Sequence, residues 1–416
     1  MQISLHIPQK LTASIALPAS KSVSNRALMI QALCPEKRHN IANLAVCDDT
    51  DHMLQGVEDK RAGAPLVDIG ATGTAMRFLT AYLAITEGET VITGSERMKQ
   101  RPIGTLVEAL RTLGADITYI NKEGYPPLRI RGKRLQGGTL EIEAGISSQY
   151  ISALLMVAPC LTDGLTLHLK GNIASRTYIE LTLDLMRRYG ATAEWTDGQT
   201  IHVSPGTYKD IPLTVEADWS AASYWYELTA IASHLGHDVD ITLPALTPDS
   251  RQGDRVVAQL FEELGVKTDY TKKGARLLNS EFKIQNSELE TLDFTHCPDI
   301  AQTMAVTYCL LGIPFTFSGI HSLRIKETDR VEALIAELRK LGYVLHAEGN
   351  ERLIWDGTRC EAQEQPTIAT YDDHRMAMAF APAGLIYKGL TIEHPEVVTK
   401  SYPTFWEDLL QLKIEN

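Results

Sequence analysis

A repeat of 75 to 77 residues constrains the fold of this chain more than any other feature of its sequence. Four segments with the pattern of amphipathic helices end at intervals of 76, 75 and 77 residues, in Gly114, Gly190, Gly265 and Gly342. Glycine is common just beyond the last turn of a helix, because it adopts the left-handed conformation without strain. The spacing therefore predicts a fold assembled from copies of one structural unit.

A second landmark recurs at a similar interval. Short polar loops run directly into alanine-rich apolar segments, which predicts helix starts at Thr74, Ser148, Ser220, Asp299 and His374. The first such loop, at Lys21, lies only 53 residues before Thr74, and a helix beginning near Asp48 is expected to stop at Gly56. The first unit is therefore shorter than the others by about twenty residues.

Segments that alternate between apolar and polar residues lie among these helices. Residues 140–143, residues 165–169 and the N-terminal stretch 1–7 alternate with a period of two, which predicts strands. A chain of 416 residues exceeds what one hydrophobic core usually holds. Six units are therefore expected to form two mixed α/β domains of three units each.

Composition and charge narrow the possible partners. The net charge of −12 argues against binding to nucleic acid or to an acidic membrane, both of which require a basic surface. No stretch approaches 18 uninterrupted apolar residues, and the N-terminus lacks the pattern of a signal peptide. The six cysteines are scattered without a C-x-x-C pair, so we expect a cytoplasmic protein.

The six polar loops at the helix starts are the strongest functional signal. Capping of the helices would explain their serine, threonine and aspartate residues. It does not explain the cations in or just beyond these loops, which are Lys21, Arg26, Arg77 and Arg375. A cation beside the positive end of a helix is unfavourable unless an anion lies between them. The loops therefore predict binding of phosphate or carboxylate groups.

Three further charged segments, residues 99–102, 324–330 and 398–401, have a simpler alternative interpretation as solvated helix faces. In the second of them, Glu327 could simply pair locally with its neighbours. His374 could likewise be a core or capping histidine. The sequence lacks the phosphate loop of nucleotide-binding proteins, the dinucleotide fingerprint and the zinc-protease motif, so no cofactor or metal is expected.

Together these segments resemble the signature segments of the 5-enolpyruvylshikimate-3-phosphate synthases, a family of enolpyruvyl transferases. The resemblance extends from Lys21 to about Pro403 and rests on S-K-S-V-S-N-R-A-L, G-T-A-M-R, Q-R-P-I-G-T-L-V-E-A-L, I-S-S-Q-Y-I-S-A-L-L-M, K-E-T-D-R and D-D-H-R-M-A-M. It implies a two-domain inside-out α/β barrel with three βαβαββ units per domain.

The resemblance also implies different roles for the two expected domains. Residues 1–20 and 217–416 would form a discontinuous C-terminal domain with the catalytic residues and the phosphoenolpyruvate side. Residues 21–216 would form an N-terminal domain for shikimate 3-phosphate, with the active site in the cleft between them. The reaction would transfer the carboxyvinyl group of phosphoenolpyruvate to the 5-hydroxyl of shikimate 3-phosphate and release phosphate, on the pathway to chorismate and the aromatic amino acids. We expect a monomer whose partners are these small molecules.

Residue by residue, the resemblance implies two overlapping sets of ligands. The set for shikimate 3-phosphate is Lys21, Ser22, Arg26, Ser147, Ser148, Gln149, Ser175, Tyr178, Asp299 and Lys326. The set for phosphoenolpyruvate is Lys21, Gly73, Arg101, Gln149, Arg330, Arg375 and Lys400. Asp299 would remove the hydroxyl proton and handle the proton in the elimination, and Glu327 and Lys21 are the candidates for the groups acting around C3 of phosphoenolpyruvate and the bridging oxygens.

Two positions depart from the family pattern. Ala71 stands where the family usually has asparagine in G-N-A-G-T, and Ser322 stands for an asparagine expected before R-x-K-E. Ala71 removes an amide donor from the expected phosphoenolpyruvate pocket. The first unit is also shorter between Asp51 and Asp68, where no expected ligand falls.

Two other functions remain compatible with these features. One is enolpyruvyl transfer to UDP-N-acetylglucosamine, but the stretch 94–102 has no cysteine where that sister family carries one. The other is a non-catalytic relative that only binds anions. The presence of Asp299, Glu327 and Lys21 together argues against it.

Overall fold

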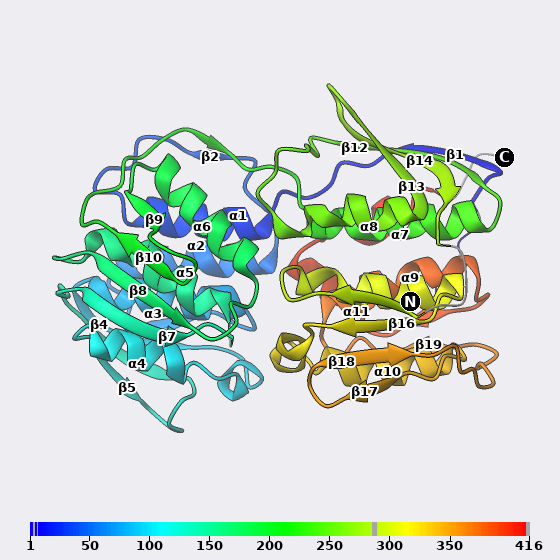
Figure 1. The fold of residues 1–416 in the computed structure, drawn as a ribbon. Helices are drawn as coiled ribbons and strands as arrows, with labels where there is room; N and C mark the ends of the chain where they lie inside the picture. Colours follow the sequence, from blue (N-terminus) through cyan, green and yellow to red (C-terminus); the bar gives the residue numbers. More distant parts are fainter. Residues whose placement is uncertain (3–4, 6, 146, 285–288, 413–416) are drawn as a thin grey trace. The chain divides into compact units, whose positions relative to one another are not determined.

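The computed structural model describes residues 1–2, 5, 7–145, 147–284 and 289–412. The chain forms two compact units, each with its own hydrophobic core. The N-terminal unit is Ala19–Val215, and the C-terminal unit combines Met1–Pro18 with Glu216–Asn416. Figure 1 draws the N-terminal unit in blue to green and most of the C-terminal unit in green to red.

Each unit contains two four-stranded sheets and one two-stranded sheet (Figure 1). In the N-terminal unit the first sheet has the order β3 (Leu66–Asp68), β4 (Gly88–Thr93), β6 (Leu128–Gly132), β5 (Asp116–Tyr119). The second has the order β7 (Gly138–Glu143), β8 (Leu165–Lys170), β10 (Thr200–Val203), β9 (Ala193–Trp195). The short strands β2 (Ile41–Ala42) and β11 (Leu213–Thr214) pair in parallel.

The C-terminal unit repeats this plan. Its first sheet has the order β1 (Lys10–Ser14), β12 (Asp238–Pro244), β14 (Gly274–Phe282), β13 (Leu264–Thr271). Its second has the order β15 (Glu290–Asp293), β16 (Phe315–Ser318), β18 (Arg352–Trp355), β17 (His346–Glu348), and β19 (Thr367–Ile368) pairs in parallel with β20 (Thr391–Ile392). All four large sheets begin with a parallel pair and continue with two antiparallel pairings.

The interior of each unit is made of helices, and the sheets lie outside them. The inner helices are α1 (Lys21–Ala32), α3 (Gly73–Ile85) and α5 (Ser148–Val157) in the N-terminal unit and α7 (Trp219–His234), α9 (Ala301–Leu311) and α11 (His374–Phe380) in the C-terminal unit. Helix α3 packs on α1 and α5, and α9 packs on α7 and α11. Every residue of α9 is buried, as expected for a helix that is mostly apolar on all sides. The predicted inside-out α/β fold is confirmed.

Six outer helices complete the repeats: α2 (Asp48–Arg61), α4 (Gly104–Thr112), α6 (Arg176–Arg188), α8 (Val257–Glu263), α10 (Arg330–Lys340) and α12 (Phe405–Leu410). The glycines that marked the repeat follow α4, α6, α8 and α10, each with a positive φ between 80° and 97°. The predicted helix ends are confirmed there, because a left-handed residue closes each helix.

The prediction for Gly56 was wrong. Helix α2 continues through Gly56 to Arg61, and Gly63, with φ of 74°, follows its end instead. A Cβ atom at position 56 would lie 2.3 Å from Cδ1 of Leu79 on α3. Glycine at this position therefore permits close packing of α2 on α3 and does not end the helix.

The N-terminal strand was also misplaced. Residues 3, 4 and 6 of the predicted strand 1–7 lie outside the described residues, and of the others only Gln2 forms an isolated bridge, with Thr391. The strand lies later, at β1, where Lys10 to Ser14 pair in parallel with Asp238 to Thr242 of β12. The alternation of residues 140–143 and 165–169 correctly predicted β7 and β8.

The short first repeat has a structural explanation. After β2 and α2 the chain enters β3 of the next repeat directly, without the antiparallel pair of strands that follows α4 and α6. The last repeat behaves alike within the described residues, since no strand follows α12 there.

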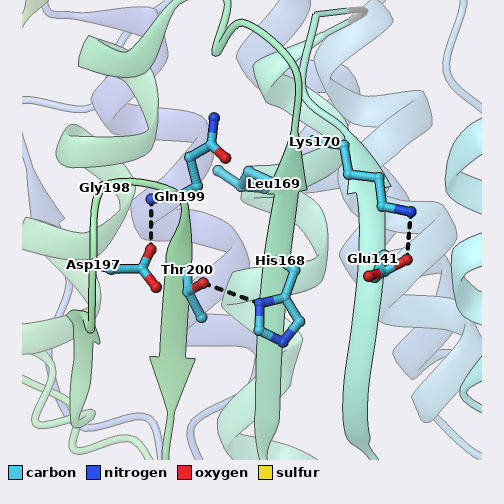
Figure 2. Close-up of a pocket in the computed structure, with 8 residues that line it drawn as sticks. All are labelled: Glu141, His168, Leu169, Lys170, Asp197, Gly198, Gln199 and Thr200. Carbon is cyan, nitrogen blue, oxygen red and sulfur yellow. Dashed lines mark hydrogen bonds and ion pairs between the residues drawn. The ribbon is translucent and has the colours of Figure 1, made fainter.

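A hollow of about 440 Å³ opens on the N-terminal unit beside β7, β8 and β10 (Figure 2). Its polar side chains already have partners. Lys170 forms an ion pair with Glu141, His168 lies 3.0 Å from the hydroxyl of Thr200, and Asp197 accepts a hydrogen bond from the backbone of Gln199. The hollow contains none of the predicted site residues.

Candidate active site

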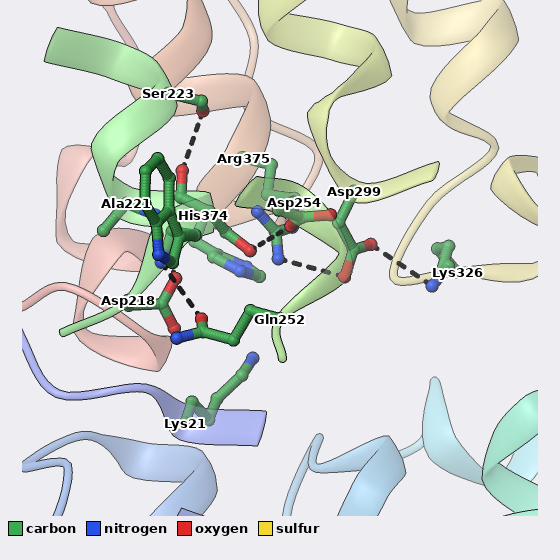
Figure 3. Close-up of polar contacts among 12 residues, drawn as sticks. Lys21, Asp218, Ala221, Ser223, Gln252, Asp254, Asp299, Lys326, His374 and Arg375 are labelled. Carbon is green, nitrogen blue, oxygen red and sulfur yellow. Dashed lines mark hydrogen bonds and ion pairs between the residues drawn. The ribbon is translucent and has the colours of Figure 1, made fainter. Parts of the chain in front are cut away.

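Asp299 occupies the centre of a charged cluster in the C-terminal unit (Figure 3). It lies in a short 3-10 helix, Pro298–Ile300, that leads into α9, and its side chain is 17% exposed. Its Oδ1 lies 3.3 Å from Nζ of Lys326 and 3.3 Å from Nη1 of Arg330. Its Oδ2 lies 3.1 Å from Nη2 of Arg375. Two cations of the segment 324–330 and one from the start of α11 therefore surround one carboxylate.

Glu327 is the second carboxylate of this cluster. Its Oε2 accepts a hydrogen bond from Nη2 of Arg330 at 3.1 Å, and its Oε1 lies 2.9 Å from Nζ of Lys400. The pair with Arg330 is the local contact that the simpler interpretation of residues 324–330 anticipated. The segment is not a helix face, because α10 begins only at Arg330, with Asp329 as its N-cap.

Arg330 links the two carboxylates to a third. It is 1% exposed and also binds Asp373, with Nε 2.6 Å from Oδ2 and Nη2 3.2 Å from Oδ1. Burial lowers the pKa of Arg330, but the charges of Asp373, Glu327 and Asp299 outweigh burial and raise it above its ordinary value. Burial lowers the pKa of Lys326. Arg330 is thus a permanent charge, whereas Lys326 releases its proton more easily.

Asp373 belongs to this cluster, although it was not among the ligands or catalytic residues predicted from the sequence. It caps α11 by accepting a hydrogen bond from the backbone N–H of Arg375 at 2.9 Å, and it holds Arg330 at the same time. The two residues are 43 positions apart. The sequence signal was present in the neighbouring charges of D-D-H-R, but only the packing of α10 beside α11 pairs them.

In the N-terminal unit, the start of α1 presents Lys21 and Ser22. Nζ of Lys21 lies 2.7 Å from Oδ2 of Asp49, and Ser20 caps the helix. Arg26 points into the interior of the unit, where it is 2% exposed. Its Nε donates to Thr182 at 2.7 Å, and burial lowers its pKa to about 10.

Two guanidinium groups converge on the start of α3. A Cβ atom at Gly73 would lie 2.8 Å from Nη1 and Nη2 of Arg101 and 2.9 Å from Nη1 of Arg77. Arg77 also donates to the carbonyl of Gly73 at 3.0 Å. Thr72, the N-cap residue, makes no side-chain capping bond. The backbone N–H groups and the two cations make this helix start suitable for an anion.

The start of α5 lies close to that of α3. Nε2 of Gln149 donates to Oγ1 of Thr74 at 3.2 Å, and Ser147 caps α5. Ile146, which precedes them in the predicted loop, lies outside the described residues. Ser175, with φ of 55°, precedes α6, and the ring of Tyr178 lies 5.7 Å from the Arg26 guanidinium.

The predicted residues therefore fall into two groups. One group gathers at the starts of α1, α3, α5 and α6, and the other at the starts of α9, α10 and α11 and at Lys400. Of the two departures from the family pattern, Ala71 is exposed beside Gly73, and Ser322 lies half-buried in a 3-10 turn, His321–Ile325. Among the described residues there is no cluster of three metal-binding side chains and no helix long and apolar enough to cross a membrane.

Comparison with known proteins covers nearly the whole chain. A family model described as EPSP synthase (3-phosphoshikimate 1-carboxyvinyltransferase) matches residues 5–409. A 3-phosphoshikimate 1-carboxyvinyltransferase from Bacteroides fragilis is 52% identical, over 98% of this chain and 97% of that protein. One from Photobacterium profundum is 36% identical, over 99% and 98% of the two chains. A solved EPSP synthase from Acinetobacter baumannii has the same fold, with a TM-score of 0.74 at 22% identity over 99% and 97% of the two chains.

Proposed function

Since the chain belongs to the EPSP synthase family, we propose that its two groups of polar residues bind the substrates of that reaction and catalyse it. Membership confirms the resemblance seen in the motifs. The reaction transfers the enolpyruvyl group of phosphoenolpyruvate to the 5-hydroxyl of shikimate 3-phosphate and releases phosphate, within aromatic amino-acid biosynthesis. Transfer to UDP-N-acetylglucosamine is not favoured.

The observation that supports the proposed roles most strongly is that two carboxylates, those of Asp299 and Glu327, form ion pairs with surrounding cations. The hydroxyl must lose a proton when its oxygen bonds to C2 of phosphoenolpyruvate, and C3 must gain one. Asp299 is the base in this proposal, because its partly exposed carboxylate can accept a proton while Lys326, Arg330 and Arg375 hold it in place. In the second step C3 returns its proton to the group that supplied it and the bond between C2 and the phosphate oxygen breaks. The proton held by Asp299 leaves with the phosphate, so every enzyme group returns to its starting state.

Glu327 and Lys21 are the proposed groups for proton transfer at C3. Glu327 is held between Arg330 and Lys400, and Lys21 is held by Asp49. The cations Arg101, Arg330, Arg375 and Lys400 would bind the phosphoryl and carboxylate groups of phosphoenolpyruvate together with Gly73, Gln149 and Lys21. Their role is electrostatic, since charge on these groups changes as the reaction proceeds.

The phosphate of shikimate 3-phosphate would bind in the N-terminal unit. Ser147 and Ser148 lie at one helix start and Ser22 and Lys21 at another, so hydroxyl, backbone and ammonium donors are all available. Gln149, Ser175, Tyr178 and Arg26 would complete the contacts to the acceptor, with Asp299 and Lys326 supplied by the C-terminal unit.

The decisive test is a phosphate-release assay with purified protein. We expect turnover with shikimate 3-phosphate and phosphoenolpyruvate, and none when UDP-N-acetylglucosamine replaces the acceptor. Turnover only with the UDP-sugar would overturn the assignment of the substrate. Retained turnover in Asp299→Asn would instead overturn the assignment of the base.

Because the proposed ligands come from both units, we propose that the N-terminal unit binds the acceptor, that the C-terminal unit supplies most of the catalytic groups, and that both act on the same substrates in a shared cleft. Small-angle scattering tests this proposal. The radius of gyration should fall when both substrates, or an unreactive pair of analogues, are added. An unchanged radius would contradict substrate-induced closure.

We also propose a cytoplasmic monomer that binds neither nucleic acid nor membranes. Its acidic net charge and its six free cysteines support this. Light scattering coupled to gel filtration should give the mass of one chain, and a dimer mass would contradict it.

A further inference from the structure

A buried carboxyl group that the proposed mechanism does not use lies in the same cluster as Asp299. Asp254 is part of a 3-10 turn, Gly253–Val256, and is only 2% exposed. Its Oδ1 is buried and has no hydrogen-bond partner in the described structure. A buried carboxyl oxygen without a partner is costly, so its retention calls for an explanation. Asp254 is not among the residues that are proposed to bind the substrates.

The segment that carries Asp254 is fastened to the start of α7. The side chain of Gln252 accepts a hydrogen bond from the backbone N–H of Trp219 at 3.0 Å and donates to the carbonyl of Ala217 at 2.8 Å. The hydroxyl of Ser220 donates to Oδ2 of Asp254. These contacts hold the carboxyl in one position, so it cannot turn away to reach water.

The groups that act on Asp254 come from three elements: the 3-10 helix of Asp299, the start of α7, and α11 (Figure 3). Burial and the negative charge of Asp299 raise the pKa of Asp254 to about 7, and Asp218 at the N-cap of α7 contributes in the same direction. Arg375 of α11 and the hydroxyl of Ser220 lower it.

Cys297 and helix α8 also adjoin this group. Burial raises the pKa of the Cys297 thiol above its ordinary range, and the negative charges of Asp254 and other carboxylates raise it further. Helix α8 follows the 3-10 turn directly, and its carboxylates Glu262 and Glu263 pair with Lys283. The charged groups that act on Asp254 are therefore Asp299, Arg375 and Asp218.

We propose that Asp254 is a positioning residue for the transfer reaction, which acts through Arg375 on Asp299 and sets how strongly Asp299 attracts the proton of the substrate hydroxyl. This inference rests on the proposed role of Asp299 as the base. Arg375 lies 3.1 Å from Oδ2 of Asp299 and also interacts with Asp254. The positive charge of this guanidinium therefore acts both on a partly exposed carboxylate that reacts and on a buried one that does not.

The protonation of Asp254 changes this sharing. When Asp254 is neutral, the positive charge of Arg375 acts mainly on Asp299 and makes it a weaker base. When Asp254 is ionised, it draws on Arg375 and its negative charge repels that of Asp299, so Asp299 becomes a stronger base. The rate of the proton-transfer step should accordingly rise with pH through the pKa of Asp254.

The test is the pH dependence of kcat. In the wild-type chain kcat should rise between about pH 6 and about pH 8, with a midpoint near 7, the pKa of Asp254. Asp254→Asn keeps the shape of the side chain but cannot ionise. It should abolish the rise and lower kcat at about pH 8 by roughly three- to tenfold, with smaller changes in both KM values.

A second pair of variants makes the test independent of the folding of Asp254→Asn. Ser220→Ala removes a donor to ionised Asp254, so the pKa of Asp254 should increase and the midpoint of the kcat profile should move to higher pH. Ser223→Ala is the matched control. Its hydroxyl donates to the carbonyl of Ser220 at 2.7 Å and contacts Thr303 at 3.1 Å, so its profile should match that of the wild type.

Superimposable profiles of wild type, Asp254→Asn and Ser220→Ala would overturn this inference. If Asp254→Asn does not fold, an unshifted profile of Ser220→Ala overturns it alone. Asp299→Asn distinguishes failure of the proposed role of Asp254 from failure of the proposed role of Asp299. If that variant loses turnover while Asp254→Asn keeps the wild-type profile, only the role of Asp254 fails. If Asp299→Asn keeps turnover, the proposed base is wrong.

Discussion

The cations of the two units have different ion-pair and hydrogen-bond partners. In the C-terminal unit Lys326, Arg330, Arg375 and Lys400 all form ion pairs with carboxylates. In the N-terminal unit Lys21 pairs with Asp49, whereas Arg26 and Arg77 donate hydrogen bonds to hydroxyl, carbonyl and thioether groups of the protein. Neutral acceptors leave the positive charge available to an anionic ligand, whereas carboxylates offset the charge and can exchange protons. The comparison suggests that the N-terminal unit serves mainly binding and the C-terminal unit mainly proton transfer.

Asp299→Asn should produce the largest effect, because it removes the proposed base. We expect kcat to fall by roughly a thousandfold, with KM for phosphoenolpyruvate unchanged or lower, since Lys326, Arg330 and Arg375 lose an opposing charge. Steady-state kinetics with both substrates measures this. If KM rose while kcat stayed constant, the C-terminal cluster would be a binding site and the comparison would fail.

Lys21→Ala should have the second-largest effect. Loss of this ammonium group at the start of α1 should reduce kcat/KM by about a hundredfold or more, because a charged donor to both substrates disappears. The variant should still unfold cooperatively but at a somewhat lower temperature, because the buried carboxylate of Asp49 loses this partner. The matched control is Lys99→Ala, which removes an exposed pair with Glu96 and should retain activity. Wild-type turnover in Lys21→Ala would remove Lys21 from the site.

Gly73→Ala should have a smaller effect, confined to binding. The added Cβ would press on the guanidinium groups of Arg101 and Arg77, which are the far ends of long side chains and would have to shift away from the helix start. We expect KM for phosphoenolpyruvate to rise by about tenfold and kcat to change little. Gly198→Ala is the control, because a Cβ there meets no atom within 4 Å. An equal loss of kcat would mean that the N-terminal unit also serves the chemical step.

Glu227→Gln should have the smallest effect on turnover and a measurable one on stability. Glu227 of α7 is fully buried, and burial raises its pKa well above the ordinary value. The folded protein therefore binds a proton that the unfolded chain releases above about pH 4.3, and stability falls as pH rises above that value. The variant should be more stable than the wild type near neutral pH and should lose this pH dependence. Denaturant unfolding of the wild type and the variant at about pH 5 and about pH 8 measures the stability and its pH dependence. The same pH dependence of stability in both proteins would contradict this prediction.

Much of the fold follows from local sequence patterns. The periods of 75 to 77 residues and the glycines after α4, α6, α8 and α10 depend only on helix amphipathicity and on the left-handed residue that ends a helix. The strands β7 and β8 could be predicted because alternation of apolar and polar residues indicates a strand with one buried face. The order of the motifs along the chain likewise indicated the family.

Other features depend on contacts between residues distant in the sequence, and only the tertiary structure decided them. Gly56 has the local signature of a helix end, yet it lies inside α2 because Leu79 packs against it. Arg330 and Asp373 are far apart in the sequence and pair because α10 packs beside α11. Asp254 has no sequence motif of its own, and its position beside Arg375 and Asp299 arises from burial and folding alone. Sequence by itself determined the repeat, the helix starts and the family, because these are local or ordered along the chain. The charge environment of each carboxylate required the fold, because it is the sum of groups that only packing brings together.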